Sequence, residues 1–412
     1  MDRDRSLGYV STPDDLVRFI VSLASPQVAG CSYCKVLEPG CGSAPFLLHY
    51  ASLFGTDHDF FGVDIDYNRL SLAQSLLPFG ASLFHEDFIL WEPGQKFDVI
   101  LGNPPYGIVG DASHYPIHSL LDRKSEYKRR ISTWKGKYNL YAAFIEKSVS
   151  MLRPGGVLVF VVPASWLVLE DFSLLRSYLS TTGSIDVFYL GKVFPKVNVS
   201  VTVLRFVYGG KGLRLYDLSG GAWKGSSVPE PFLSKPVYSG EVIRFESQGW
   251  LDFESSGIPL GEVFEVKFAA RSTEFVKSGL VRSSPLPGDV PVLTGRNLKP
   301  GFIDYGTPYS GWWMKREDAA RIREFYSVPH LVVAHTKGTK LVSAVDWLAY
   351  PWREEFHLLP RDGFSPDLSL VEQHLNSERV QKYLFQLYRD FVPHLTKAML
   401  LRVPLPPDIL KK

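Results

Sequence analysis

The sequence predicts an α/β domain with a mostly parallel sheet, followed by a second domain of mixed α+β structure. Apolar segments alternate with amphipathic segments through the first half of the chain, which is the pattern of βαβ units. Gly, Ser and Pro then become frequent over residues 209–240, which marks a domain boundary. A chain of 412 residues is also too long for one hydrophobic core. We therefore expect domains at residues 1–235 and 236–412.

Strands of the first domain are expected where short apolar segments end in polar or glycine residues, with helices between them. Residues 157–162 are all apolar and mostly β-branched, which is typical of a strand buried on both faces of a sheet. Residues 185–190 and 200–207 predict an antiparallel hairpin added to the parallel sheet. The other expected strands are 34–37, 60–63 and 97–101, and the expected helices are 45–54, 67–77, 138–152 and, in the second domain, 368–387.

Basic residues are concentrated in one segment of the first domain, although the net charge of the chain is only +2. Tyr127 and Trp134 lie in the same segment, and Glu126 is its single acidic residue. Such a cluster suits a phosphate backbone, and it is equally the composition of a solvated helix face. Both interpretations stay open from charge alone. The basic residues are Arg123, Lys124, Lys128, Arg129, Arg130, Lys135 and Lys137.

The N-terminal residues predict no secretory signal, because Met-Asp-Arg-Asp-Arg is charged and no apolar run follows it. No segment of the sequence reaches the roughly 18 apolar residues that are needed to cross a bilayer. These features lead us to expect an enzyme of the cytoplasm that has no membrane partner.

The three cysteines of the chain do not predict a metal site. Cys31 and Cys34 have the spacing of zinc ligands, but a structural zinc usually needs a second pair or nearby histidines. The sequence has no second pair, and Cys41 stands apart. We expect Cys31 and Cys34 to form a reversible disulfide or to be unremarkable surface thiols, and we expect no bound metal.

Three polar segments follow strands of the predicted parallel sheet, where ligands of open α/β folds bind. Residues 36–42 end in a turn that contains Gly40, and glycine lets a backbone approach a ligand closely. Asp64 can accept hydrogen bonds from both hydroxyls of a ribose. Asp87 can accept from an exocyclic amine while Phe88 packs on an adenine face. Together the segments predict a cofactor that contains a nucleoside.

S-adenosylmethionine is favoured over NAD as this cofactor. The dinucleotide fingerprint Gly-x-Gly-x-x-Gly is absent, because Gly40 and Gly42 lead to Ala44 and Pro45. A pyrophosphate would need the third small residue and a clear helix N-terminus. The motif at residues 103–106, which follows the strand expected at 97–101, supports the same choice.

Asn103, Pro104, Pro105 and Tyr106 form a motif directly after the strand expected at 97–101. The two prolines fix φ and lack backbone donors, so the carbonyl groups stay exposed in a stiff geometry. The side-chain oxygen of Asn103 and the carbonyl of Pro104 would hold the two N–H groups of a planar amine. The amine nitrogen would then attack the sulfonium methyl directly, with positioning and electrostatics supplying the rate. The alternative is a strand-to-loop turn that contains two prolines.

An amine inside a base pair is unreachable, so an enzyme acting on a duplex must flip the base out, at a cost of roughly a few kcal/mol. Stacking on an aromatic side chain returns about 1–3 kcal/mol per contact. Tyr106 is one candidate for this stacking. Phe194, between the two strands of the expected hairpin, is the other, and packing in the core is its alternative role.

Segments along most of the chain resemble the TaqI family of DNA adenine-N6 methyltransferases, which have the γ-type arrangement. In this arrangement the cofactor motifs precede the catalytic motif, and target recognition comes last. The resemblance implies a Rossmann-like sheet that binds S-adenosylmethionine, followed by a target-recognition domain. The segments that carry it are 11–13, 37–39, 62–66, 87–88, 101–110, 132–141, 154–169, 293–301, 332–339, 350–360 and 388–396.

The resemblance implies which residues hold the cofactor. Gly40 replaces an alanine of the family pattern, a change that is common among methyltransferases. The implied contacts are Thr12 and Glu38 to the methionine part, Asp64 to the ribose, Ile65 and Phe88 to the two adenine faces, Asp87 to the adenine amine and Phe144 to the methyl-transfer pocket, with Gly40 and Pro105 as further cofactor-binding residues.

The resemblance also implies the target. Asn103, Pro104, Tyr106 and Phe194 would form the site of the target adenine, within 5′-TCGA-3′ in double-stranded DNA. Residues 195–198 are less rich in lysine than the family pattern. A cognate restriction endonuclease acting on the same sequence is the family's usual setting. We expect a monomer, because one copy can act on each strand in turn.

Basic residues are candidates for DNA contacts, since Arg commonly reads guanine edges and Lys binds phosphates. Pro393 would either wedge into the space that a flipped base leaves or pack in the core. The candidates are Lys128, Arg129, Arg130 and Lys135 in the basic cluster, and Arg271, Arg296, Lys299, His335, Lys337, Arg353 and Arg389 in the second half.

Three other functions stay open beside this one. The same four-residue motif serves enzymes that methylate glutamine side chains in release factors, and some RNA base methyltransferases. A glutamine methyltransferase would not need the long second domain, and an RNA enzyme would more often add a small RNA-binding module. A catalytically idle DNA-binding subunit is the third alternative, and the intact motif and Asp64 argue against it.

Overall fold

The computed structural model describes residue 8 and residues 10–25, 32–111, 116–117, 119–195, 198–225, 227–335 and 340–411. Its internal contacts divide the chain into two units, Met1–Arg244 and Phe245–Lys412. The division therefore falls after Arg244, whereas the sequence led us to place it after residue 235. The two units are described separately below.

The first unit is built on a sheet whose described strands lie in the order β11-β10-β8-β9-β7-β4-β1-β2-β3. The strands from β7 to β3 are parallel to one another. The predicted α/β class is thus confirmed. The bounds are β1 (Lys35–Pro39), β2 (Asp59–Asp64), β3 (Ser82–His85), β4 (Phe97–Gly102), β7 (Leu152–Pro163), β8 (Gly183–Gly191), β9 (Val201–Tyr208), β10 (Leu213–Asp217) and β11 (Leu233–Lys235).

The predicted antiparallel hairpin is β8 and β9, but β9 lies inside the sheet rather than at its edge. It pairs antiparallel with β8 on one side and with β7 on the other. A buried ion cluster crosses the same strands, because the Asp186 carboxylate accepts from Arg205 at 2.6 Å and from Arg214 at 2.7 Å. The Arg205 Nε also donates to the Leu23 carbonyl at 2.9 Å. Burial of these charges is tolerated because each is paired.

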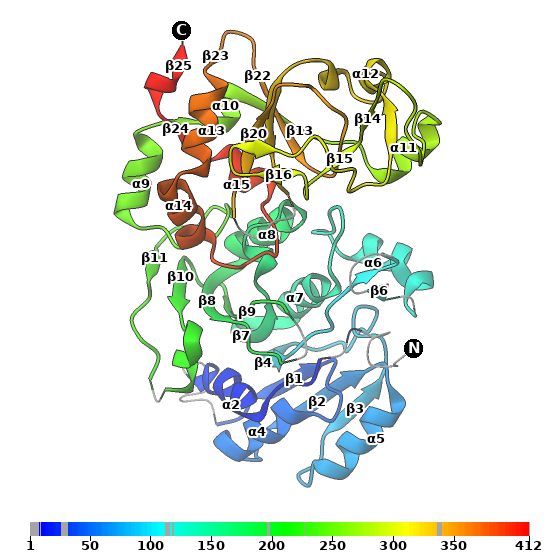
Figure 1. The fold of residues 1–412 in the computed structure, drawn as a ribbon. Helices are drawn as coiled ribbons and strands as arrows, with labels where there is room; N and C mark the ends of the chain where they lie inside the picture. Colours follow the sequence, from blue (N-terminus) through cyan, green and yellow to red (C-terminus); the bar gives the residue numbers. More distant parts are fainter. Residues whose placement is uncertain are drawn as a thin grey trace. The chain divides into compact units, whose positions relative to one another are not determined.

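Helices cover both faces of this sheet. Figure 1 shows α2, α4 and α5 on one side of it and α7 and α8 on the other. The α2 helix buries Leu16, Val17, Ile20 and Val21, the spacing of one helical face. Every helix among the described residues is too short or too polar to span a lipid bilayer. The bounds are α2 (Asp14–Ser22), α4 (Pro45–Phe54), α5 (Tyr67–Leu76), α6 (Lys124–Arg130), α7 (Leu140–Met151) and α8 (Ser173–Thr182), with the short strands β5 (Ile108–Val109) and β6 (Pro116–Ile117) and 3-10 turns η1 (Leu121–Arg123), η2 (Ala164–Leu167), η3 (Glu170–Phe172) and η4 (Ser219–Lys224).

The second unit has its own antiparallel sheet, in the order β13-β22-β19-β20. The single helix expected over 368–387 is two helices, α13 and α14, which are separated at Ser377. The Ser377 hydroxyl accepts from the Val380 N–H and caps α14, so a new helix begins there. The sheet strands are β13 (Phe264–Phe268), β19 (His330–Val333), β20 (Ser343–Asp346) and β22 (Phe356–Pro360), and the helices are α9 (Gln248–Ser255), α10 (Leu260–Val263), α11 (Ser272–Ser278), α12 (Ala319–Ile322), α13 (Leu368–Asn376), α14 (Glu378–Tyr388) and α15 (Lys397–Leu401).

Short two- and three-residue strands complete the second unit and pair outside its main sheet. β14 pairs antiparallel with β18, and β15 pairs parallel with β21. The bounds are β12 (Ile258–Pro259), β14 (Asp289–Pro291), β15 (Leu293–Thr294), β16 (Leu298–Lys299), β17 (Phe302–Ile303), β18 (Trp313–Lys315), β21 (Trp352–Arg353), β23 (Ser365–Pro366), β24 (Pro404–Leu405) and β25 (Leu410–Lys411), with 3-10 turns η5 (Arg316–Asp318), η6 (Glu324–Ser327) and η7 (Pro407–Ile409). The predicted α+β class of this half is confirmed.

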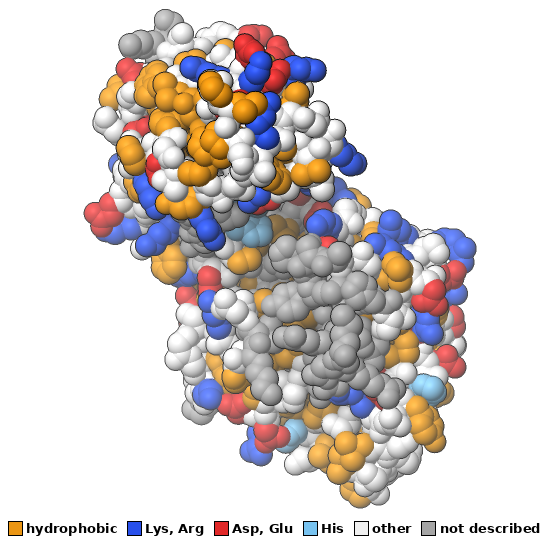
Figure 2. Space-filling model, turned by 45° about the vertical axis from the view of Figure 1, so that its right-hand side comes forward, with side chains coloured by type: hydrophobic (Ala, Val, Ile, Leu, Met, Phe, Trp, Pro, Cys, Tyr) orange, Lys and Arg blue, Asp and Glu red, His pale blue; other side chains and the backbone are white. Residues whose placement is uncertain are grey.

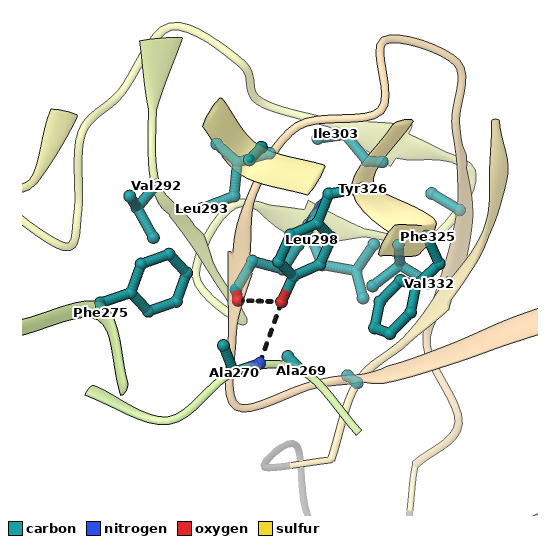
Figure 3. Close-up of a cluster of buried hydrophobic side chains, with 14 of the residues drawn as sticks. Ala269, Ala270, Phe275, Val292, Leu293, Leu298, Ile303, Phe325, Tyr326 and Val332 are labelled. Atoms are coloured by element: carbon teal, nitrogen blue, oxygen red, sulfur yellow. Dashed lines mark hydrogen bonds between the residues drawn. The ribbon is translucent and has the colours of Figure 1, made fainter. Parts of the chain in front are cut away.

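Tyr326 lies at the centre of the apolar core of the second unit. Figure 3 shows its ring among aliphatic and aromatic side chains, with its hydroxyl between two backbone groups. The hydroxyl accepts from the Ala270 N–H at 2.9 Å and donates to the Trp352 carbonyl at 2.6 Å. The one polar atom of this ring is therefore satisfied within the core.

A second polar centre of this unit is Asp346, whose side chain is fully buried. Its carboxylate accepts from the Trp352 Nε1 at 2.7 Å and from the Tyr305 hydroxyl at 2.9 Å. It also accepts from the backbone N–H groups of Tyr350 and Leu348, at 3.0 and 3.2 Å. One carboxylate thus ties the end of β20 to the turn that leads into β21.

His330 and His357 form a buried pair in the same unit. The His330 Nδ1 lies 2.6 Å from the Val328 carbonyl, which can only accept, so this nitrogen carries the hydrogen. The other ring nitrogen of His330 then accepts from the His357 Nδ1 at 2.6 Å. The His357 Nε2 is buried without a partner among the described residues. Burial of the two rings favours their neutral forms.

The stability of the second unit should fall as the pH drops below about 6.5, the ordinary histidine pKa. Burial lowers the pKa of His330, and burial together with the adjacent His330 lowers the pKa of His357 still further. Asp346 is the charged group that faces His330 and partly opposes this shift. Below that pH the unfolded chain binds more protons than the folded one. Each such extra proton lowers the free energy of unfolding by about 1.4 kcal/mol for every pH unit. Urea unfolding at pH 8 and pH 5.5 tests this, and equal midpoints would contradict it.

Candidate active site

The turn after β1 is held in a conformation that favours glycine. Gly40 and Gly42 have φ of +66° and +54°, in the left-handed region. The Gly40 N–H donates to the Val63 carbonyl at 2.7 Å, which fixes the turn against the end of β2. Pro45 then occupies the first position of α4, where its missing N–H costs little. The backbone of the turn is therefore rigid before any ligand binds.

Asp64 ends β2 and faces this turn. Its carboxylate accepts from the Gly42 N–H and from the Asp66 N–H, both at 2.7 Å. Burial raises the pKa of Asp64, while these two hydrogen bonds oppose the rise. A carboxylate has about four acceptor positions, so two remain for a ligand that carries hydroxyl groups.

Glu38 has a role that the sequence did not indicate. Its buried carboxylate accepts from the Leu47 N–H at 2.9 Å, at the start of α4. A negative charge at a helix N-terminus is favourable, because the backbone N–H groups there have no helical partner. Burial nevertheless raises the pKa of Glu38 well above its usual value. Among the described residues Glu38 does not line the pocket below, and its contact with the methionine part stays a prediction.

Asp87 and Phe88 follow β3. One Asp87 oxygen accepts from the Ile89 N–H at 3.1 Å. The other accepts from Arg123 at 2.8 Å and from the Tyr127 hydroxyl, two groups contributed by η1 and α6. Phe88 is buried, and its ring centroid lies 4.8 Å from that of Phe144. Phe88, one of the predicted adenine-binding residues, thus forms an aromatic pair with Phe144.

These strand ends surround one open pocket. Eight residues predicted from the sequence line it. Seven lining residues were not predicted, among them Tyr127 from the basic segment and Leu120, which precedes that segment. The predicted lining residues are Gly40, Asp64, Ile65, Asp87, Phe88, Asn103, Pro105 and Phe144, and the others are Val63, Asp66, Arg69, Glu86, Leu120, Tyr127 and Leu140.

The Asn103 amide is held in one orientation. Its Nδ2 donates to the Val10 carbonyl and to the Thr12 Oγ1, both at 2.9 Å. Since a carbonyl only accepts hydrogen bonds, the nitrogen must face Val10 and the oxygen must face the other way. That oxygen, Oδ1, is buried and has no partner among the described residues. A buried unsatisfied acceptor costs about 1–3 kcal/mol, so this position is suited to a donor from a ligand.

Tyr106 and Phe194 are neighbours, as the sequence led us to expect of a shared site. Their ring centroids are 6.4 Å apart and the rings meet edge to face. Tyr106 is anchored at both ends, since its N–H donates to the Gly8 carbonyl and its hydroxyl to the Val161 carbonyl. Burial raises the pKa of Tyr106 well above its ordinary value. The phenol is therefore neutral and is not a base at physiological pH.

The cysteines and potential metal ligands fit the expectation only in part. Cys34 is buried, so it is not the surface thiol that the sequence suggested, and Cys41 is buried as well. Cys31 lies outside the described residues. Over the described ranges, no group of three or more His, Cys, Asp and Glu side chains is placed to hold a metal ion.

Comparison with known proteins identifies the family. Residues 68–194 match the model of the Eco57I restriction-modification methylases, and residues 290–405 match the TaqI-like C-terminal specificity domain. The chain is 57% identical over 403 residues to the type II methyltransferase M.TthHB8I of Thermus thermophilus, covering 97% of this chain and 91% of that protein. The chain belongs to the TaqI-type family of type II DNA methyltransferases. Its methyl donor is S-adenosylmethionine, as the sequence predicted.

More distant relatives match only parts of this methyltransferase. The modification methylase CviBIII of Paramecium bursaria Chlorella virus is 30% identical over 133 residues, covering 32% of this chain and 31% of that protein. The electron cryomicroscopy structure of a DrdV–DNA complex has a TM-score of 0.58 at 12% identity, covering 87% of this chain and 50% of that one. At this identity the likeness shows the fold alone.

The basic cluster of the methyltransferase is largely ion-paired. Arg129 and Arg130 contact Glu126, Arg130 also contacts Glu92, and Lys135 contacts Glu170. Figure 2 likewise shows Lys and Arg side chains lying among Asp and Glu side chains. Lys128 is exposed, as are Arg129 and Arg130. Tyr127 is buried against Asp87 and is not available to a phosphate backbone, so that part of the interpretation was wrong.

The candidate DNA contacts of the second unit differ in their surroundings. Arg353 lies over the Trp312 ring at 5.5 Å, and Arg389 lies over the Phe245 ring at 4.7 Å. Pro393 is exposed between the buried Val392 and the His394 position, so core packing does not explain it. Lys337 lies outside the described residues. Arg271, Arg296 and Lys299 are exposed, and His335 is half-buried.

Proposed function

We propose that this methyltransferase transfers a methyl group to N6 of an adenine that is flipped out of duplex DNA, within 5′-TCGA-3′. The observation that carries the proposal is the buried oxygen of Asn103, which has no partner among the described residues and belongs to a residue that lines the pocket. An exocyclic amine is the donor that this acceptor suits. The choice of adenine and of the sequence TCGA rests on the resemblance to the TaqI family.

The residues of the motif would act by positioning. S-adenosylmethionine supplies an electrophilic methyl group when it is bound. The Asn103 Oδ1 and the Pro104 carbonyl would each accept one N–H of the target amine, which increases electron density on its nitrogen and aims it. The anchored Tyr106, together with Phe194, would stack on the extruded base and offset the cost of flipping. Tyr106 is neutral, so no base is assigned to the motif.

The cofactor residues follow the same proposal. These residues line one pocket, which supports their proposed roles toward the ribose (Asp64), the adenine (Phe88) and the methyl group (near Asn103). The proposed set is Gly40, Asp64, Ile65, Asp87, Phe88, Pro105 and Phe144, with Thr12 and Glu38 proposed for the methionine part.

Thr12→Ala is expected to lower the rate of methyl transfer about tenfold, the loss that follows from one hydrogen bond of about 1.4 kcal/mol. The Thr12 hydroxyl accepts from the Asn103 Nδ2 and so helps to orient its oxygen. Thr12→Ser keeps the hydroxyl and should keep the rate. Single-turnover kinetics at saturating cofactor test this. A change in cofactor affinity with an unchanged rate would instead support a contact with the methionine part.

The proposed reaction is tested with duplexes that differ from the TCGA duplex either in base sequence or in the amine of the target adenine. The protein is incubated with radiolabelled S-adenosylmethionine and a TCGA duplex, a scrambled duplex, and a TCGA duplex in which the adenine of the site is replaced in both strands by purine, which lacks the amine. Label in the first duplex alone is expected, and digestion to nucleosides should yield N6-methyl-2′-deoxyadenosine. Label in the purine duplex, in RNA or in a release factor, but not in TCGA, would overturn the proposal.

We further propose that the methyltransferase protects DNA from a cognate restriction endonuclease and acts as a monomer. DNA methylated by the protein should resist a nuclease that cuts TCGA, while mock-treated DNA should be cleaved. Sedimentation at working concentration should give the mass of one chain, 46.4 kDa. Cleavage of the methylated DNA, or a dimer that is required for activity, would contradict these two points separately.

A further inference from the structure

A segment that overlaps the basic cluster contributes two buried side chains to the pocket. This segment, residues 120–130, contains η1 and α6 and is called the clasp below. Its Leu120 and Tyr127 side chains are buried and line the pocket. No strand end of the sheet supplies these two contacts. The clasp therefore forms a wall of the pocket that the sheet alone would leave open.

Two residues of the clasp bind the same carboxylate oxygen. Arg123 Nη1 and the Tyr127 hydroxyl both donate to the Asp87 Oδ2. The Asp87 side chain is 9% exposed and that of Arg123 is 38% exposed, so the pair is partly shielded from water. The ion pair with Asp87 raises the pKa of Arg123 above its ordinary value, and the guanidinium stays charged. The adenosine end of the pocket and the clasp are thus joined by a charge-assisted contact.

A second contact joins the other end of the clasp to Glu92, in the segment that follows Asp87. Arg130 Nη1 donates to the Glu92 carboxylate at 2.8 Å, five residues after Asp87. The Tyr127 ring is also packed against Trp134, at 6.5 Å between centroids, and Trp134 stacks on Tyr138 at 5.0 Å. The clasp is therefore fixed along its length, with Arg123 and Tyr127 at the end that faces the pocket.

Asp87 keeps acceptor capacity for a ligand while the clasp is in place. Its Oδ1 accepts from the Ile89 N–H alone among the described residues, and a carboxylate oxygen can accept twice. Binding of an exocyclic amine at Oδ1 therefore does not require the Arg123 contact at Oδ2 to break. The clasp and the cofactor would bind opposite oxygens of one carboxylate at the same time.

We infer that Arg123 and Tyr127 are positioning residues of the cofactor site, and that they hold residues 120–130 closed over the adenosine half of S-adenosylmethionine through Asp87. The inference rests on the proposed role of Asp87 toward the cofactor. Loss of the clasp contacts should weaken cofactor binding and speed its release, because one wall of the pocket would then be mobile.

The inference is tested by titrating S-adenosylmethionine into the full chain without DNA, in a calorimeter. Arg123→Ala should raise the Kd about tenfold, and Tyr127→Phe, which keeps the ring, about threefold. Arg123→Lys should fall between wild type and Arg123→Ala, because it keeps the charge but not the planar group. Arg153→Ala is the matched control, since it removes a half-exposed Arg–Asp pair from the same unit and should leave the Kd unchanged.

Hydrogen exchange supplies a readout that separates the clasp from general stability. In the wild type, S-adenosylmethionine should slow amide exchange across residues 120–130, and in Arg123→Ala this protection should be lost while exchange in β4 and β7 stays slow. A wild-type Kd in Arg123→Ala would overturn the inference, and so would tighter binding, which would mean that Arg123 competes with the cofactor. Because no DNA is present, a failure of TCGA methylation would leave this result unaffected.

Discussion

Asn103→Ala is expected to lower the rate of methyl transfer by two to three orders of magnitude, about the loss seen when one oriented hydrogen-bonding group is removed from a polar site. The substitution removes a side-chain acceptor of the motif that is buried, oriented and without a partner among the described residues. Its loss affects the target amine rather than the cofactor. The Kd for S-adenosylmethionine should therefore stay within about a few-fold of the wild-type value.

Single-turnover rates with a TCGA duplex and calorimetric cofactor affinities test whether the rate falls while the Kd is kept. Asn68→Ala is the matched control, because Asn68 is an exposed asparagine of the same unit. Asn103→Gln is a second variant that keeps the amide but displaces it by one methylene group, and it should also be slow. If Asn103→Ala turned over at the wild-type rate, the proposed amine site would be wrong.

Asp346→Ala is expected to destabilise the second unit by about 3–5 kcal/mol, a large share of the stability of an ordinary domain. The substitution leaves four donors without their acceptor, two from side chains and two from the backbone, and the Trp352 Nε1 among them is buried. Trp352→Phe removes only one of these donors and leaves the carboxylate in place. It should therefore cost less, although it also exchanges a large buried ring for a smaller one.

Hydrogen exchange of the full chain locates this loss. Peptides from β19, β20 and β22 should exchange faster in Asp346→Ala, whereas peptides from β4 and β7 serve as an internal reference and should not change. Asp318→Ala, which removes an exposed pair with Arg321, is the control. Unchanged exchange in β20 would show that the four donors find other acceptors.

Sequence alone predicted those parts of the site that depend on where strands end. Asp64, Asp87 and Asn103 each follow an apolar run, and parallel strands bring their carboxyl ends to one edge. The sheet also followed from periodicity, because strands such as 157–162 are uninterrupted apolar runs. The helix break at Ser377 had a readable signal, a serine directly before Glu378 that marks a helix N-terminus, and it was missed.

Other features depend on contacts that no local pattern encodes. The Thr12 hydroxyl orients an amide that lies 91 residues later in the chain. The charge pattern of residues 123–137 is the same whether Arg123 faces a phosphate or Asp87, and only the fold decides between them. The hydrogen bond from the Leu47 N–H to the Glu38 carboxylate, at the start of α4, was also not predicted. Such residues need tertiary structure because their partners are chosen by packing.

The position of β9 between β7 and β8 has a consequence for how the sheet forms during synthesis, because strands leave the ribosome in chain order. β7 and β8 are both synthesised before β9, yet neither pairs with the other, so each presents an open edge until residue 208 has emerged. Open strand edges are prone to mispairing. Phe194 lies on the connection that leads into β9. A nascent chain therefore cannot complete the aromatic part of its base site until β9 has been inserted between β7 and β8.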